Sequence, residues 1–193
     1  MNPSVYCTIG PFFPAEFSDG CSDLTRNNGK VARGEHILLS GRVLEEGGKP
    51  TVNTIVEIWQ PDANGIFRHA LDPRCGQADP GFFGWGRART DADGWYRFRT
   101  VLPGSYEWEG NMRCPHLNMM VLAIGLTRRL VTTAFFPEDP TNASDLVLDS
   151  VSDLAMRARL IAKRDPSADA AGAAGYRFDL ILRGAEETPF FVD

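Results

Sequence analysis

Three side chains near the middle of the chain have the types and spacing of an incomplete metal site. Tyr106 precedes His116, and Asn118 follows His116 at position i+2. Residues i and i+2 of a β-strand point to one face, so a histidine at 118 would bring two imidazoles to one ion, with Tyr106 as oxygen donor. Imidazole suits iron, zinc and copper, whereas a neutral amide is a poor ligand for such ions. The sequence therefore predicts a metal-site framework that lacks one of its ligands.

The composition restricts the classes of protein to which the chain can belong. Its 193 residues are enough for one domain with a sizeable core. A net charge of −5 argues against a nucleic-acid surface, which normally needs a basic footprint. No apolar run is long enough for a membrane span, and residues 1–6 lack the basic and apolar regions of a signal peptide. These features predict a cytoplasmic protein.

The four cysteines, Cys7, Cys21, Cys75 and Cys114, are irregularly spaced and form no Cys-x-x-Cys pair. A zinc site or a disulfide would be the functional alternatives. In a reducing compartment free thiols are the more common outcome, and we expect four of them.

The elements that must position these side chains are mostly strands. Alternating or continuous apolar segments bounded by Gly, Pro and Asp turns predict strands at 36–44, 54–60, 95–101, 117–125, 129–136 and 176–182. One short helix is expected from Ser152, as its N-cap, to about Leu160. The four tryptophans read mainly as core residues. We expect an all-β fold, an antiparallel β-sandwich over 35–193, preceded by an irregular N-terminal arm over 1–34 that packs on a partner chain.

Several blocks of sequence together resemble one enzyme family. They occupy 41–44, 56–65, 67–69, 84–87, 90–100, 103–106 and 113–116, and the resemblance extends from about 35 to 191. The block Glu-Ile-Trp-Gln-Pro-Asp-Ala-Asn-Gly at 57–65 is the most specific of them. The arrangement resembles the intradiol ring-cleaving dioxygenases, which implies a β-sandwich that cleaves a catechol-type aromatic ring with O2.

The resemblance also implies a ligand set for iron(III), made of two tyrosines and two histidines. The matching positions are Phe67, Tyr106, His116 and Asn118, so two of the four lack the family's ligand. Trp108 and Arg113 match positions that line the family's site, and Thr133 stands where a glutamine is expected. We therefore interpret these positions as a vestigial metal site and predict that this chain holds no metal.

Some members of the family are built from two homologous chains, and the resemblance implies such an assembly here. In these members an iron-binding β subunit holds Fe(III), and the N-terminal arm of an iron-free α subunit roofs the site at their interface. Thr8, Gly10 and Pro11 match the α-subunit arm, with Phe12 in place of a tyrosine and Ile124 in place of an arginine. These residues are expected to form one wall of the partner's pocket for a small aromatic acid.

Three other interpretations remain open at this point. The chain could be a stand-alone, iron-free binding or structural β-sandwich derived from the family. It could also be a mononuclear metalloenzyme with changed ligands. Tyr106 and His116 could instead be polar core residues with satisfied hydrogen bonds, as buried polar groups usually are, and His69 reads as structural.

Overall fold

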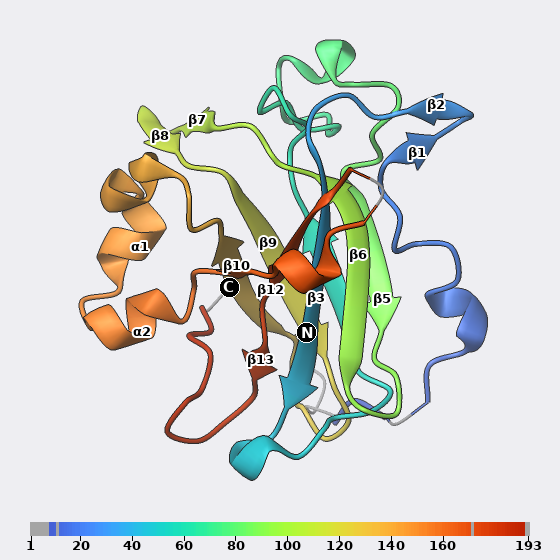
Figure 1. Cartoon of the computed structure of the whole chain (residues 1–193), viewed down its shortest axis with the longest axis vertical. Coiled ribbons are helices and arrows are strands. Elements are labelled where there is room, and N and C mark those ends of the chain that lie inside the picture. Colours follow the sequence, from blue (N-terminus) through green and yellow to red (C-terminus); the bar gives the residue numbers. More distant parts are fainter. Residues whose placement is uncertain (1–7, 11, 171, 192–193) are drawn as a thin grey trace, which may run out of the picture.

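The computed structural model describes residues 8–10, 12–170 and 172–191 and forms a β-sandwich of two main sheets (Figure 1). One sheet has the strand order β10-β9-β4-β5, and the other has β11-β12-β3-β13 with β6 paired to β3. Two hairpins, β1-β2 and β7-β8, stand outside these sheets. The strands are β1 Arg26–Asn27, β2 Lys30–Val31, β3 His36–Leu44, β4 Ile55–Trp59, β5 Trp85–Arg89, β6 Trp95–Val101, β7 Tyr106–Trp108, β8 Asn111–Arg113, β9 His116–Leu122, β10 Leu130–Phe135, β11 Lys163–Arg164, β12 Ala174–Arg177 and β13 Leu180–Ile181.

The core lies between the two sheets and follows the period of two expected from the sequence. In β3 every second residue is buried, beginning with Ile37, and in β9 the buried set includes Leu117, Met119 and Val121. These side chains belong to one apolar cluster. Because alternate residues of a strand face opposite ways, His116 and Asn118 lie on the outer face of β9. The predicted antiparallel β-sandwich is confirmed.

Two strand pairings depart from the antiparallel pattern. β12 and β13 both pair with β3 in parallel, with a bend at Phe178 and Asp179 between them. At this bend the backbone approaches Gly41 so closely that a Cβ there would lie 1.8 Å from the carbonyl oxygen of Phe178. Tyr96 donates a hydrogen bond to the same carbonyl. Only glycine can occupy position 41 without displacing this junction.

The helical segment differs from the prediction, because it contains two α-helices in place of one. They are α1 Leu146–Ser150 and α2 Leu154–Ala158. Asp145 caps α1, and Asp153, not Ser152, caps α2 by accepting the N–H groups of Ala155 and Met156. Each helix has five residues, so neither presents the repeated apolar period by which longer helices are detected. In the described part of the chain no helix approaches the length needed to cross a bilayer.

The N-terminal segment packs on its own domain through several contacts. Leu24 is fully buried in the main core, so this part of the segment is a core element rather than an irregular appendage. Upstream, the short 3-10 turn Ala15–Phe17 lies against β5, where the Arg87 guanidinium stacks on the Phe17 ring at 3.6 Å. The division of the chain at residue 34 and the packing of the arm on a partner stay predictions.

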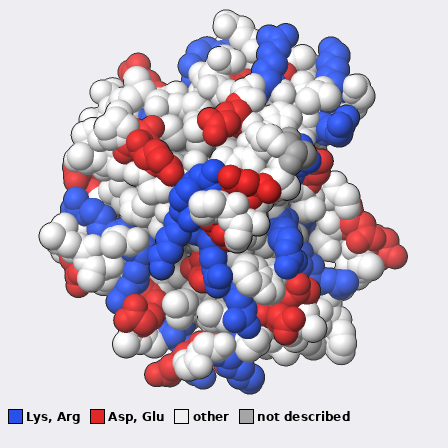
Figure 2. All heavy atoms as spheres, in the orientation of Figure 1, with Lys and Arg blue, Asp and Glu red and all other residues white. Residues whose placement is uncertain are grey.

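Charges of both signs are interspersed over the face shown in Figure 2. Ion pairs such as Arg164–Asp169, Arg177–Asp179 and Arg97–Asp91 join neighbouring residues. Of the cysteines, Cys21, Cys75 and Cys114 are free thiols, whereas Cys7 lies outside the described residues.

Candidate functional site

A pocket of about 710 Å³ opens at the end of the sandwich where β4 ends and β9 begins. The β7-β8 hairpin supplies one side of it, and the loop after β4, from Phe67 to Arg74, supplies another. The pocket is lined by Trp59, Phe67, His69, Leu71, Asp72, Pro73, Arg74, Tyr106, Glu107, Trp108, Glu109, Arg113 and Asn118. It therefore brings together three of the four predicted ligand positions, and His116 lies directly behind Tyr106.

The register of the sheet explains how Asn118 reaches this place. Asn118 stands opposite Trp59 of β4 on one side and opposite Thr133 of β10 on the other. Directly opposed residues of an antiparallel pair share a face of the sheet. Trp59, Asn118 and Thr133 thus form one row across the outer face, with Thr133 buried and Trp59 partly exposed.

Tyr106 and His116 are bonded to each other. The Tyr106 hydroxyl lies 3.2 Å from Nε2 of His116, and Nδ1 of His116 lies 2.7 Å from the carbonyl oxygen of Cys114. A carbonyl can only accept, so Nδ1 carries the proton and Nε2 accepts from the tyrosine. Burial, together with the nearby charge of Arg113, lowers the pKa of His116 to about 4. The imidazole is consequently neutral at physiological pH.

Phe67 takes the place that a second oxygen donor would need. Its ring meets Tyr106 edge to face at a centroid distance of 4.9 Å and stacks on Trp59 at 6.0 Å. Burial raises the pKa of Tyr106 above its ordinary value, which favours the protonated phenol.

These residues do not fit a ferric ion. Phe67 offers no donor atom, Asn118 offers only an amide, and Tyr106 uses its hydroxyl proton to satisfy the imidazole nitrogen that would face a metal. Among the described residues, no group of three or more His, Cys, Asp or Glu side chains is placed to hold a metal. The arrangement is that of a hydrogen-bonded aromatic pocket.

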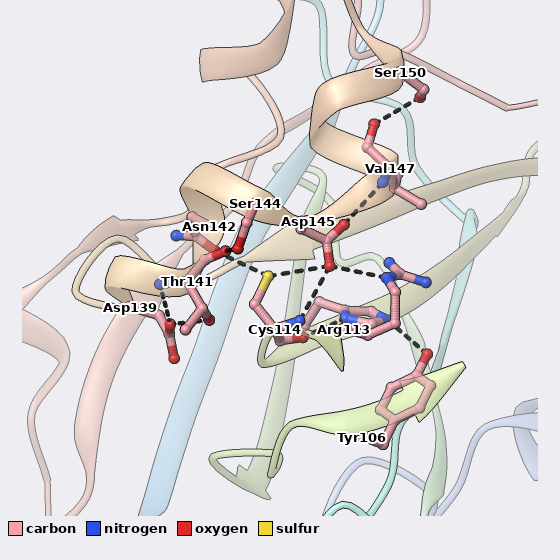
Figure 3. Close-up of polar contacts among 11 residues, drawn as sticks. Tyr106, Arg113, Cys114, Asp139, Thr141, Asn142, Ser144, Asp145, Val147 and Ser150 are labelled. Atoms are coloured by element: carbon pink, nitrogen blue, oxygen red, sulfur yellow. Dashed lines mark hydrogen bonds and ion pairs between the residues drawn. The ribbon is translucent and has the colours of Figure 1, made fainter. Parts of the chain in front are cut away.

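Asp145 fixes the rear of the pocket, and sequence reasoning missed it (Figure 3). One carboxylate oxygen accepts from Nε of Arg113 at 2.8 Å and from the backbone N–H of Cys114 at 3.1 Å, and the other caps α1 through Val147. Burial opposes the charge of Asp145, but the hydrogen bond and charge of Arg113 hold the pKa of this fully buried carboxyl below its ordinary value. A carboxylate this far along the sequence from Arg113 carries no local signal of the contact.

The tryptophans are placed differently from the prediction. Trp59 and Trp108 are 36% and 57% exposed and line the pocket, and Trp85 and Trp95 are only half-buried. The interpretation of all four as mainly core residues is therefore wrong. His69 lies beside Trp59, and its Nδ1 accepts the N–H of Leu71, which agrees with a structural role.

The predicted partner-facing residues gather elsewhere. The backbone of Ile9 bonds to Leu126 and Gly125 at 2.7 and 3.1 Å, which sets Thr8 and Gly10 beside the turn that contains Ile124. Phe12 is 89% exposed and Ile124 is 52% exposed, whereas Pro11 lies outside the described residues. The part of β9 between Asn118 and Leu122 spans roughly 13 Å, at about 3.3 Å per residue, and separates this patch from the pocket.

The comparisons with known proteins agree on one family. The profile of the family described as "Dioxygenase" matches residues 9–184. The chain is 42% identical over 174 residues to the protocatechuate 3,4-dioxygenase beta chain of Burkholderia cepacia, covering 86% of this chain and 73% of that one. It is 33% identical over 194 residues to the alpha chain from the same organism, covering 95% and 94%.

Solved structures show the same fold. Catechol 1,2-dioxygenase from Acinetobacter sp. ADP1 is 26% identical and superposes with a TM-score of 0.65, over 89% of this chain and 60% of that chain. A profile that covers most of the sequence, together with relatives of both chain types and a shared sandwich, decides the assignment. The chain belongs to the intradiol ring-cleaving dioxygenase family.

Proposed function

We propose that this chain is the iron-free, α-type subunit of a hetero-oligomeric protocatechuate 3,4-dioxygenase. Its β-type partner would hold Fe(III), which supplies Lewis-acid chemistry to a bound catechol-type aromatic acid. This chain would contribute a wall of that site and exclude water from it.

The observation that carries the proposal is the separation of two features within one chain. The pocket that corresponds to the family's iron site lacks two donors, at Phe67 and Asn118. The patch formed by Thr8, Gly10, Phe12 and Ile124 lies at the other end of β9, too far away to serve that pocket. If the patch contacts a substrate, the substrate belongs to a site on another chain.

Overall identity does not separate the two chain types, because the chain is similar to a beta chain at 42% and to an alpha chain at 33%. The assignment rests on the side chains at the ligand positions. An amide and a phenyl ring at two of four positions favour the iron-free type over an iron-binding one.

The test is to produce the chain alone and together with an iron-binding β chain, and to measure iron content, association and loss of the ultraviolet absorbance of protocatechuate. We expect association, with iron and ring cleavage present in the complex and absent from this chain alone. Iron-dependent cleavage by the isolated chain, or failure of the two chains to associate, would contradict the proposal.

A further inference from the structure

The pocket retains the walls of a binding site although it does not fit a metal. Its volume of about 710 Å³ is in the range of small-molecule sites. Four aromatic side chains, Trp59, Phe67, Tyr106 and Trp108, line it. Walls of this kind favour a flat ring, which can pack against them edge to face or offset.

Arg113 provides the polar end of this pocket. Only 8% of the residue is exposed, and Nε is used by Asp145. The terminal nitrogens point away from that carboxylate (Figure 3), and Nη2 is buried with no hydrogen-bond partner among the described residues. A buried donor without a partner is costly, and an anionic oxygen is the acceptor that a guanidinium binds most strongly.

The acidic groups around the pocket leave room for such a ligand. Asp72 accepts the N–H groups of Phe67 and Arg74 and pairs with the Arg74 side chain at 3.3 Å. Glu107 and Glu109 are exposed on the hairpin, where water screens their charge. Arg113 is therefore the site's buried donor, and its acceptor has to come from a ligand.

We infer that the pocket binds a planar aromatic anion without a metal, with the ring against Trp59 and Trp108 and the anionic oxygen on Arg113. This ligand site lies on this chain and is separate from the site at the proposed interface with a partner. The inference does not depend on the proposed function, since it concerns the isolated chain.

Isothermal titration calorimetry of the full chain in EDTA tests this inference, with benzoate as the probe. We expect one saturable benzoate site per chain. Cyclohexanecarboxylate, which has the charge without the flat ring, should bind at least about five-fold more weakly, and inorganic phosphate should not compete. Absence of a saturable benzoate site, or equal binding of phosphate, would overturn the inference.

Variants locate the site on the chain. W108A removes an exposed wall residue and should raise the benzoate Kd about five- to ten-fold. R113K keeps the charge opposite Asp145 but loses the terminal nitrogens, and should raise the Kd at least ten-fold. F83A is the matched control, because Phe83 is a similarly exposed aromatic residue that does not line the pocket. An unchanged Kd in W108A would overturn the inference even if R113K fails to fold.

Discussion

Phe67 and Asn118 each lie beside a side chain that could still bind a metal. Tyr106 meets the Phe67 ring at 4.9 Å, and Asn118 shares a face of β9 with His116. The backbone positions are therefore those of a converging ligand set, and the missing parts are a phenol oxygen and an imidazole.

The double variant F67Y/N118H should consequently gain Fe(III). Two phenols and two imidazoles would then converge on one point, and tyrosinate bound to Fe(III) absorbs visible light. Metal analysis and the visible spectrum measure the gain, with F67Y alone as the control that lacks an imidazole. A colourless, iron-free double variant would mean that the backbone no longer holds the ligand geometry.

His116 should make the stability of the chain depend on pH. Its pKa in the folded protein is about 4, below the ordinary 6.5, so the unfolded chain binds more protons between these values. Stability from this group is present above pH 6.5 and is lost as the pH falls towards 4. We expect a loss of about 2 kcal/mol between pH 7.5 and 4.5, from roughly 1.4 kcal/mol per pKa unit.

Urea unfolding at the two pH values measures this loss, with H116N as the control. In that variant the difference between pH 7.5 and 4.5 should shrink by about the same 2 kcal/mol. A difference that persists undiminished would assign the effect to other groups, such as Asp145.

Single residues also show what the sequence can and cannot predict about the site. Tyr106, His116 and Asn118 are close in sequence and lie on one hairpin and the strand after it, so their proximity could be predicted. Asp145 approaches Arg113 only through tertiary packing of α1, and Trp59 reaches Asn118 only through strand register. Such contacts depend on the arrangement of whole elements.

Among the elements, the N-terminal segment and β5 form a distinct contact centred on Arg87. This guanidinium bonds to Glu57 at 2.6 Å and to the carbonyl oxygen of Phe17 at 2.8 Å, and it lies between the rings of Phe17 and Trp85. Glu57 is only 8% exposed. The arginine therefore holds the segment down and also neutralises a buried carboxylate.

R87A should destabilise the chain by about 3 kcal/mol, because it leaves Glu57 buried without its partner. Limited proteolysis should then cut the segment around residues 13–20 faster. R89A is the matched control: Arg89 bonds only to the carbonyl oxygen of Phe13 at the exposed surface, and its loss should cost less than about 1 kcal/mol. Equal effects of both variants in urea unfolding would refute the special role of Arg87.

The strands could be predicted because long alternating segments such as β3 and β6 carry a strong period of two. The helices could not be bounded, since five residues give too little pattern and Asp153 competes with Ser152 as a cap. The parallel pairing of β12 and β13 with β3 was also not foreseen, because alternation gives the face of a strand and not the direction of its neighbour.

Over the whole molecule, the vestigial pocket and the exposed patch lie at opposite ends of β9. A change at one end should therefore leave the other unaffected, as is usual for sites more than about 10 Å apart. I124E should weaken association with an iron-binding β chain at least ten-fold, because it places a charge in an apolar contact, and should leave benzoate binding unchanged.

Light scattering and a binding titration with the β chain measure this effect. L154E is the control, since Leu154 is 73% exposed on α2 and lies in a different part of the fold. If L154E weakens association and I124E does not, the docking surface lies on the helices, and the arm patch has no part in it.

The parallel pairing of the last strands with β3 has a consequence for synthesis on the ribosome. β3 emerges early, but one of its edges is covered only by β12 and β13, whose residues are translated late. A nascent chain that has already formed the β3-β6 pair presents an open strand edge until then, and open edges recruit other strands. Slow translation before residue 174 would prolong the period in which the chain can aggregate.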